Sequence, residues 1–259
     1  MQLELFIQHV DYSEKKVLIG LSGGINSMAV LCWLANYPKK YKPKELHLFY
    51  AHFKEHSPDT LPFVISGIEY ARKHFERVIY QQTNNSVIEY FREQKIIPHP
   101  TIAPCTRELK IEPMMKYFNE HKLDIDLVGY VKEEKRRIKN MYKKSPATKN
   151  TKGFPISFQE NEWCFQLVKK EIGWFPEIYN IKDRKGKRVF PHNNCLPCKN
   201  MQTKDFDNVN VYFPEYWNDA MELSEDLKKH WGRDGAEFYT KFGRDLGQVD
   251  QPCEHCAFD

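Results

Sequence analysis

The chain has 259 residues, 41% of them hydrophobic, which is enough for the core of one α/β domain with an appendage or of two small domains. Its net charge of +4 is mild, and no stretch approaches the roughly 18 consecutive apolar residues that a membrane-spanning helix requires. The first residues lack the basic start and the cleavage site of a signal peptide, and the seven cysteines are an odd number, so we expect a cytoplasmic protein without membrane attachment and without a disulfide framework.

Short apolar runs alternate with longer stretches of helical spacing along the first half of the chain. The runs predict strands, and the stretches predict helices, one of which has Ser86 as its cap. Pro113 falls inside the helical stretch at 106–121, so the helix there either begins just before this residue or kinks at it. In chain order we expect a strand at 17–21, a helix at 25–37, a strand at 46–51, a helix at 58–75, a strand at 77–80, a helix at 86–94, a helix at 106–121, a strand at 126–130 and a basic helix at 132–142.

This alternation is typical of a Rossmann-like α/β fold with a mostly parallel, doubly wound sheet and helices on both faces. In such sheets ligands bind at the carboxyl ends of the strands. The segments at 22–27, at 51–59 and at Gly129 each follow a predicted strand, so we expect them to meet in one crevice.

The composition changes near residue 145, where the alternation of strands and helices stops. We therefore expect two consecutive parts, an α/β domain over residues 1–145 and a helical region over residues 146–259. The predicted features from this point are a polar, basic loop at 143–153, a helix at 160–172, an exposed turn at 182–188 and a helix at 214–231.

Residues 20–27 read Gly-Leu-Ser-Gly-Gly-Ile-Asn-Ser and lead from a predicted strand directly into a predicted helix. The first backbone N–H groups of a helix have no partner within it, and the helix dipole places partial positive charge there, so such a bend favours phosphate binding. Gly23 and Gly24 let the backbone approach an anion closely, and the hydroxyls of Ser22 and Ser27 can add donors. The alternative is a tight turn without a ligand.

The string Ser-Gly-Gly-x-x-Ser at 22–27 resembles the pyrophosphate loop (PP-loop) of the adenine nucleotide alpha-hydrolase superfamily. Residues 105–113 are similar to the Cys-Thr-x-x-Leu-Lys-x-x-Pro segment of its phosphoadenosine phosphosulfate (PAPS) reductase-like family. Residues 129–137 are similar to the family's Gly-x-Arg-x-x-Glu-Ser-x-Arg segment, from which they depart at Lys132 and Lys135. The order of these segments is the family's order.

The resemblance implies a PP-loop type fold that binds ATP or a related adenine nucleotide together with Mg²⁺. The usual family string has aspartate where this chain has Asn26, and Mg²⁺ prefers carboxylate oxygens, so metal-assisted cleavage at this position stays open. The resemblance implies catalytic roles for Asn26, Lys110, Arg136 and Arg137, and nucleotide contacts for Ser22, Gly23, Gly24, Ser27, His52 and Gly129.

For Lys110 the alternative is a surface lysine without a ligand. The same alternative holds for one of Arg136 and Arg137, because neighbouring helical residues point about 100° apart.

Cys-x-x-Cys occurs at Cys195 and Cys198 and again at Cys253 and Cys256. Two such pairs predict a metal site, because each pair can place two thiolates on one ion, and the site would staple the C-terminal residues to the body of the protein. Zinc and an iron–sulfur cluster fit this ligand set equally well. A competing set includes Cys105, because adenylyl-sulfate reductases, which this chain resembles, have a cysteine pair in that segment.

Two clusters of basic residues lie at 132–152, with nine Lys or Arg against two Glu, and at 182–188, with five against one Asp. Such clusters attract phosphate-rich partners, here tRNA or DNA, unless they are only a solvated surface.

Three functions are compatible with these patterns. The first is an enzyme that cleaves ATP between the α- and β-phosphates to activate an acceptor, for sulfur transfer to a nucleic acid from a sulfur donor protein. The second is a sulfonucleotide reductase, although the Glu-Cys-Gly string with the nucleophilic cysteine of those enzymes is absent. The third is a nucleotide sensor or accessory subunit without turnover, which Asn26 favours. A homo-oligomer is compatible with all three.

Overall fold

The computed structural model describes residues 10–96, 104–144, 151–198, 200–201 and 203–231. In this part of the chain no helix is both long and apolar enough to cross a membrane.

The chain divides into two compact units, and both are discontinuous in sequence. They differ in this respect from the two consecutive parts expected from composition, whose boundary near residue 145 stays a prediction. The first unit consists of Met1–Tyr50, Pro62–Gln82 and Met114–Phe175, and the second of Ala51–Leu61, Thr83–Pro113 and Pro176–Asp259.

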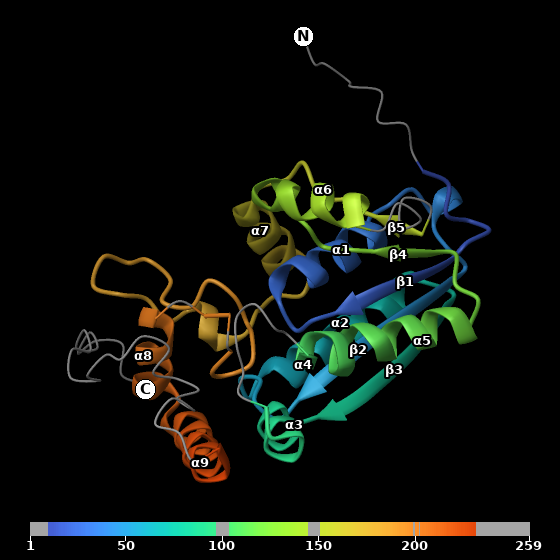
Figure 1. Ribbon diagram of the computed structural model, residues 1–259. Coiled ribbons are helices and arrows are strands. Elements are labelled where there is room, and N and C mark those ends of the chain that lie inside the picture. The colour runs from blue at the N-terminus through green and yellow to red at the C-terminus, as the bar shows by residue number, and fades with distance from the viewer. Residues whose placement is uncertain (1–9, 97–103, 145–150, 199, 202, 232–259) are drawn as a thin grey trace. The chain divides into compact units, whose positions relative to one another are not determined.

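The strands of the described residues form one sheet in the order β3-β2-β1-β4-β5 (Figure 1). β1 pairs in parallel with β2 and with β4, and β4 pairs in parallel with β5. Ile19 of β1 pairs with Leu48 on one side and with Leu127 on the other, and all three are buried. The predicted α/β fold with a mostly parallel sheet is confirmed. The strands are β1 (Lys16–Leu21), β2 (Glu45–Phe53), β3 (Arg77–Asn85), β4 (Ile125–Leu127) and β5 (Lys152–Gly153).

Helices of the first unit pack on both faces of this sheet. Figure 1 shows α5 in front of the sheet and α1 and α2 behind it. On the front face Met114 lies against Gly20, where an added Cβ would be 3.0 Å from the methionine sulfur. Behind the sheet α1 packs against α7, and Met28 lies against Gly67 of α2. These helices are α1 (Ile25–Ala35), α2 (Thr60–His74), α5 (Glu112–Glu120), α6 (Lys135–Lys144) and α7 (Asn161–Glu171).

The helical stretch around Pro113 is irregular. The chain enters α5 through α4 (Pro104–Thr106) and a π-helical turn at Arg107–Ile111. Proline has no N–H group, and its ring clashes with the carbonyl one turn earlier, so a regular helix cannot continue through it. The wider π turn accommodates the proline, and the distortion that the sequence predicts lies just before Pro113.

The second unit contains α3 (Val87–Gln94), α8 (Thr203–Tyr212) and α9 (Pro214–Trp231). α9 packs against both α3 and α8. Ser86 caps α3, since its hydroxyl accepts the N–H of Glu89 at 3.1 Å, as predicted. α8 was not predicted, because few of its residues are apolar and only Phe206 and Val209 bury large apolar side chains in it.

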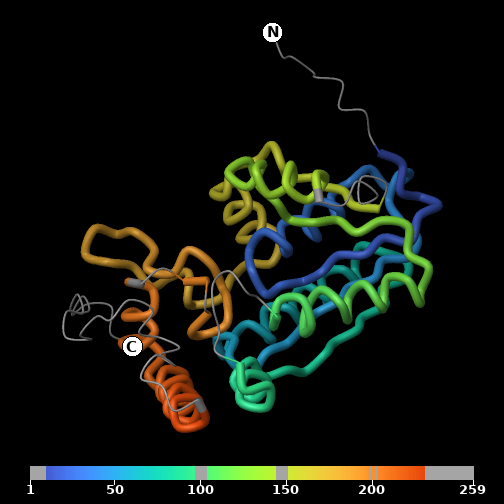
Figure 2. The backbone as a smooth tube through the Cα atoms, viewed as in Figure 1, coloured from blue at the N-terminus to red at the C-terminus, as the bar shows by residue number. Residues whose placement is uncertain are grey.

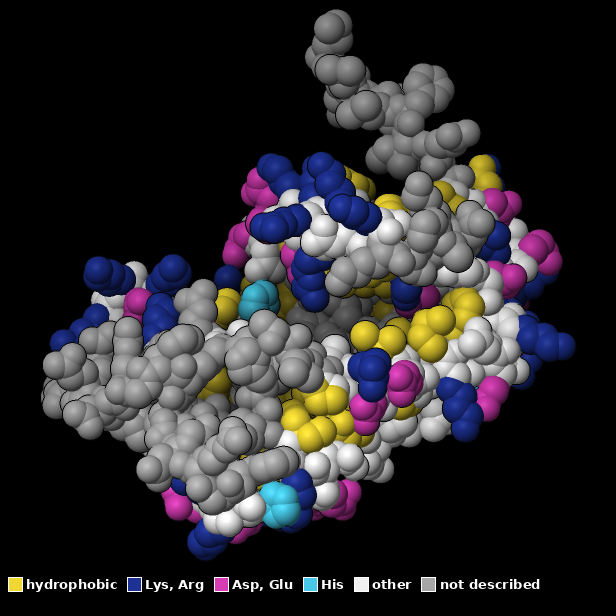
Figure 3. All heavy atoms as spheres, in the orientation of Figure 1, with side chains coloured by type: hydrophobic (Ala, Val, Ile, Leu, Met, Phe, Trp, Pro, Cys, Tyr) yellow, Lys and Arg dark blue, Asp and Glu magenta, His cyan; other side chains and the backbone are white. Residues whose placement is uncertain are grey.

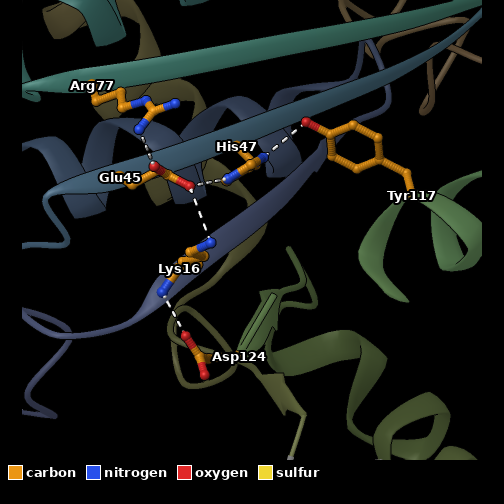
Figure 4. Close-up of polar contacts among 6 residues, drawn as sticks. All are labelled: Lys16, Glu45, His47, Arg77, Tyr117 and Asp124. Atoms are coloured by element: carbon orange, nitrogen blue, oxygen red, sulfur yellow. Dashed lines mark hydrogen bonds and ion pairs between the residues drawn. The ribbon is translucent and has the colours of Figure 1, made fainter. Parts of the chain in front are cut away.

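A buried histidine joins β2 to α5 in the first unit (Figure 4). His47 is 1% exposed, with its Nδ1 2.8 Å from the Tyr117 hydroxyl and its Nε2 2.8 Å from Glu45. A carboxylate only accepts hydrogen bonds, so Nε2 carries the proton and Nδ1 accepts from the tyrosine. Glu45 also pairs with Arg77 at 3.0 Å and with Lys16 at 3.9 Å. Burial lowers the pKa of His47 although the bond to Glu45 raises it.

This histidine should make the protein less stable in mild acid. Its pKa in the folded state lies below the ordinary value of 6.5, so as the pH falls through this region the unfolded chain takes up the proton before the native one does. We expect the free energy of unfolding in urea to fall between about pH 7.5 and about pH 5.5, and to fall less in His47→Gln. The exposed His192→Gln is the control and should keep the full decrease; equal decreases in wild type and His47→Gln would contradict this account.

Candidate functional site

The chain bends sharply from β1 into α1 (Figure 2), and two glycines, Gly23 and Gly24, lie in this bend. Gly23 has a φ of +77°, in the left-handed region that glycine adopts without strain. Gly24 is extended, with φ −95° and ψ 162°, and α1 begins after it at Ile25 without a side-chain cap. The strand therefore turns into the helix within three residues, and the start of α1 has the geometry of a phosphate-binding helix terminus.

Two serines hold this bend in shape. The Ser27 hydroxyl donates to the Gly24 carbonyl at 3.0 Å and accepts the N–H of Ser22 at 3.1 Å. A hydroxyl has one proton, so in the 3.1 Å contact between the two hydroxyls Ser22 is the donor. The Ser22 oxygen in turn accepts the N–H of Gly24 at 3.3 Å. Both hydroxyl protons, which the sequence predicts as donors to a ligand, are used inside the bend in this conformation.

Gly129, which follows β4, lies directly against the first turn of α1. A Cβ at this position would be 2.6 Å from the carbonyl oxygen of Asn26 and 3.0 Å from the N–H nitrogen of Ser27. These are backbone atoms that cannot swing away as a side chain can. Only glycine fits here, so the structure brings together two segments that the sequence assigns to one site.

The two arginines of α6 have different surroundings. Arg137 forms an ion pair with Glu134 and lies over the ring of Tyr130, 4.6 Å from its centroid. Tyr130 stacks in parallel on Phe154 with ring centroids 5.7 Å apart. Arg136 is exposed and has no ion-pair partner among the described residues. Arg137 is thus fixed next to the segment of Gly129, whereas the guanidinium of Arg136 faces solvent.

The remaining predicted residues lie in the second unit. Lys110 places its Nζ 4.7 Å from the ring centroid of Phe53. His52 and His56 lie near each other, with ring centroids 6.3 Å apart. Burial lowers the pKa of His52, and burial, the charge of Lys110 and His52 together hold the pKa of His56 well below its usual range. Both rings are therefore neutral at pH 7.

Glu55, which lies between His52 and His56 in the sequence, has a role that the sequence did not predict. Its buried carboxylate accepts hydrogen bonds from the Ser86 hydroxyl, from Val87 N–H at 2.9 Å and from Ile88 N–H at 3.2 Å. It neutralises the start of α3, where the helix dipole favours negative charge. Its carbonyl accepts the N–H of Leu196 at 2.7 Å, which attaches the Cys-x-x-Cys segment to the end of β2.

Cys198 and Cys105 of the second unit both lie within electrostatic range of the buried Cys195. Burial raises the pKa of Cys195 to about 12, Lys110 lowers it, and Cys198 and Cys105 raise it. Among the described residues no group of three or more His, Cys, Asp or Glu side chains is arranged to hold a metal ion. Cys253 and Cys256 lie outside the described residues, so the four-cysteine site and the choice between zinc and an iron–sulfur cluster stay predictions.

No protein-family model matches the sequence, and no curated protein is significantly similar to it. Among solved structures, the chain is similar to the U34-tRNA thiolase NcsA from Methanococcus maripaludis, solved with its 4Fe–4S cluster. The identity is 14%, the match covers 94% of this chain and 80% of that chain, and the TM-score is 0.46. It is also similar to NMN synthetase from Francisella tularensis, with 14% identity, 90% of each chain covered and a TM-score of 0.44.

The contact between Gly129 and α1 predicts a specific cost of adding one methyl group. Gly129→Ala should lower the free energy of unfolding by about 1–3 kcal/mol, because the new Cβ meets backbone that must shift. Gly20→Ala is the matched control in the same unit, because its Cβ would meet only the flexible Met114 sulfur. Urea unfolding of the two variants measures the difference, and equal losses of stability would contradict the described contact.

Proposed function

We propose that this chain binds ATP or a related adenine nucleotide through the bend at residues 22–27. The observation that supports this most directly is the turn from β1 into α1 through Gly23 and Gly24, with no side-chain cap on the helix. Backbone N–H groups and the helix dipole at such a terminus favour phosphate. The same residues carry the PP-loop string, so we also propose that the chain belongs to the adenine nucleotide alpha-hydrolase superfamily. Within this superfamily we propose the PAPS reductase-like family.

In the proposed reaction an acceptor oxygen attacks the α-phosphorus of ATP. The bond from that phosphorus to the bridging oxygen breaks, and pyrophosphate leaves with the electron pair. The bend would hold the β- and γ-phosphates of this leaving group, so catalysis would come from positioning and charge stabilisation. A sulfur nucleophile delivered by a donor protein would then attack the activated position of the acceptor, tRNA or DNA. The bond to the adenylylated oxygen would break, and AMP would leave with that oxygen and the electron pair.

Within this proposal the polar residues take separate roles. Arg137 is already held by Glu134, so Arg136 is the arginine that we assign to an incoming phosphate. Lys110 would supply positive charge at the end of β2, and His52, neutral at pH 7, would hydrogen-bond the nucleotide. We assign no step to the predicted cysteine site.

Asn26 is the residue that we expect to face Mg²⁺, which would neutralise charge on the phosphates. It is half-buried in the first turn of α1, beside the backbone contact with Gly129. Its amide oxygen is a neutral ligand and binds Mg²⁺ more weakly than a carboxylate. This neutrality favours the second candidate, a sensor that binds the nucleotide without cleaving it.

Titration calorimetry with ATP tests the binding step, and a pyrophosphate-release assay with and without RNA or DNA tests turnover. We expect heat of binding in the wild type, and an affinity at least about tenfold lower in Gly129→Ala, which displaces the start of α1. Gly20→Ala should bind like the wild type. Heat without pyrophosphate would support the sensor, and the absence of heat would contradict both candidates.

Asn26→Asp tests the role of this residue. The added carboxylate strengthens the binding of Mg²⁺, and its negative charge is favourable in the first turn of a helix. We expect the variant to release pyrophosphate from ATP faster than the wild type at saturating Mg²⁺. A decrease of an existing wild-type activity would show that the amide itself is required and that this interpretation of Asn26 is wrong.

A further inference from the structure

Residues 182–188 form a short hairpin in the second unit, which we call the 182–188 hairpin. Its ends, Lys182 and Arg188, form an antiparallel bridge. Across the turn, Asp183 N–H donates to the Lys187 carbonyl at 2.8 Å, and Gly186 N–H donates to the Asp183 carbonyl at 2.9 Å. The backbone of the tip is therefore defined by its own hydrogen bonds.

The only acidic side chain of the hairpin stabilises the turn itself. The Asp183 carboxylate accepts the N–H groups of Lys185 and Lys187, both at 2.9 Å. These bonds lower the pKa of Asp183, and the bond from Lys187 N–H has the largest effect. The base of the hairpin is anchored by the buried side chains of Ile181 and Val189. The tip is thus preorganised, and its carboxylate is engaged with the backbone.

The basic side chains of the tip have no such engagement. Arg184, Lys185 and Lys187 are exposed, and none of them forms an ion pair with a described residue. Lys204 of α8 lies close enough for its charge to act on Asp183. In Figure 3 dark blue side chains gather over this segment. The hairpin, whose backbone is defined by its own hydrogen bonds, therefore presents an excess of positive charge, five basic residues against one carboxylate, which a polyanion can neutralise at little cost in ordering.

We propose that the 182–188 hairpin enters the major groove of duplex DNA and binds the phosphates on both sides of the groove. The tip has no apolar side chain that could enter a bilayer and no aromatic ring on which single-stranded bases could stack. Its cations are exposed and do not enclose a small anion. The major groove of B-form DNA, about 12 Å wide, admits a two-stranded ribbon, whereas that of A-form RNA is too narrow for side chains to read.

This inference deepens the proposed function, in which a nucleic acid is the acceptor, and it selects DNA. Binding to DNA needs no ATP, so the two proposals fail separately. A protein that binds duplex DNA but not ATP would contradict only the proposed function, and one that releases pyrophosphate from ATP but does not bind DNA would contradict only the inference.

The test is fluorescence anisotropy with a short duplex DNA over a series of salt concentrations, with the full-length protein. The triple variant Arg184→Gln, Lys185→Gln, Lys187→Gln removes three positive charges from the tip. We expect its dissociation constant to rise at least about tenfold at about 50 mM salt, and the slope of log K against log salt to fall by about 3. The control, Lys39→Gln, Lys73→Gln, Lys116→Gln, removes the same charge from exposed lysines on other elements and should bind nearly as the wild type does.

A second variant tests the hairpin by gain of affinity. Asp183→Asn keeps an oxygen that accepts the N–H groups of the turn but removes the negative charge, so DNA binding should become tighter. Three results would overturn the inference: equal losses in the two triple variants, weaker binding of Asp183→Asn, or tighter binding of anionic vesicles or duplex RNA than of duplex DNA. The variants should unfold at the wild-type temperature, because the mutated side chains are exposed.

Discussion

The first turn of α1 and the segment after β4 approach each other so closely that no side chain fits between them at Gly129. At Gly129 the space for a side chain is filled by the carbonyl of Asn26 and the N–H of Ser27. β1 and β4 are parallel neighbours, paired at Ile19 and Leu127. The segments that follow the two strands therefore leave the sheet at the same edge and occupy neighbouring space. A glycine on one side and a two-glycine bend on the other make this possible. The position of the bend is thus set by the packing of the sheet, and its inner shape by the hydrogen bonds between Ser22 and Ser27.

In the second unit, charged side chains are balanced by backbone groups and by aromatic rings. The carboxylate of Glu55 takes the position that an anionic ligand could occupy at the start of α3, while its carbonyl holds Leu196. Lys110, over the ring of Phe53, acts on both His56 and Cys195 and lowers the pKa of each. In the 182–188 hairpin the only carboxylate is likewise bound to backbone N–H groups, but the exposed side chains of Arg184, Lys185 and Lys187 form no ion pair with a described residue. The start of α3 is therefore closed to anions, and the hairpin is open to them.

Local signals in the sequence were sufficient for most of the fold. The apolar run at 17–21 and the helical spacing after Ile25 gave β1 and α1, and Ser86 marked the start of α3. β5 could not be predicted, because two residues carry no periodicity and pair only because β4 is already in place. α8 was missed because its apolar residues are few.

The candidate site was predictable in its residue types but not in its contacts. The sequence placed Gly129 after a predicted strand, but its close approach to the backbone of α1 follows from the sheet order, which no local pattern contains. The directions of the Ser22 and Ser27 hydroxyls depend on the shape of the bend and differ from the expected ones. Glu55 acts on residues more than thirty positions later in the chain, so only the folded structure reveals its role.

Hydrogen–deuterium exchange with and without a non-hydrolysable ATP analogue tests the central claim, that the main chain at residues 22–27 holds phosphate. We expect bound nucleotide to slow exchange of the amides in this bend and in the first turn of α1, because phosphate oxygens accept their N–H groups. Saturating nucleotide that leaves these amides unchanged and protects another part of the chain would contradict the account.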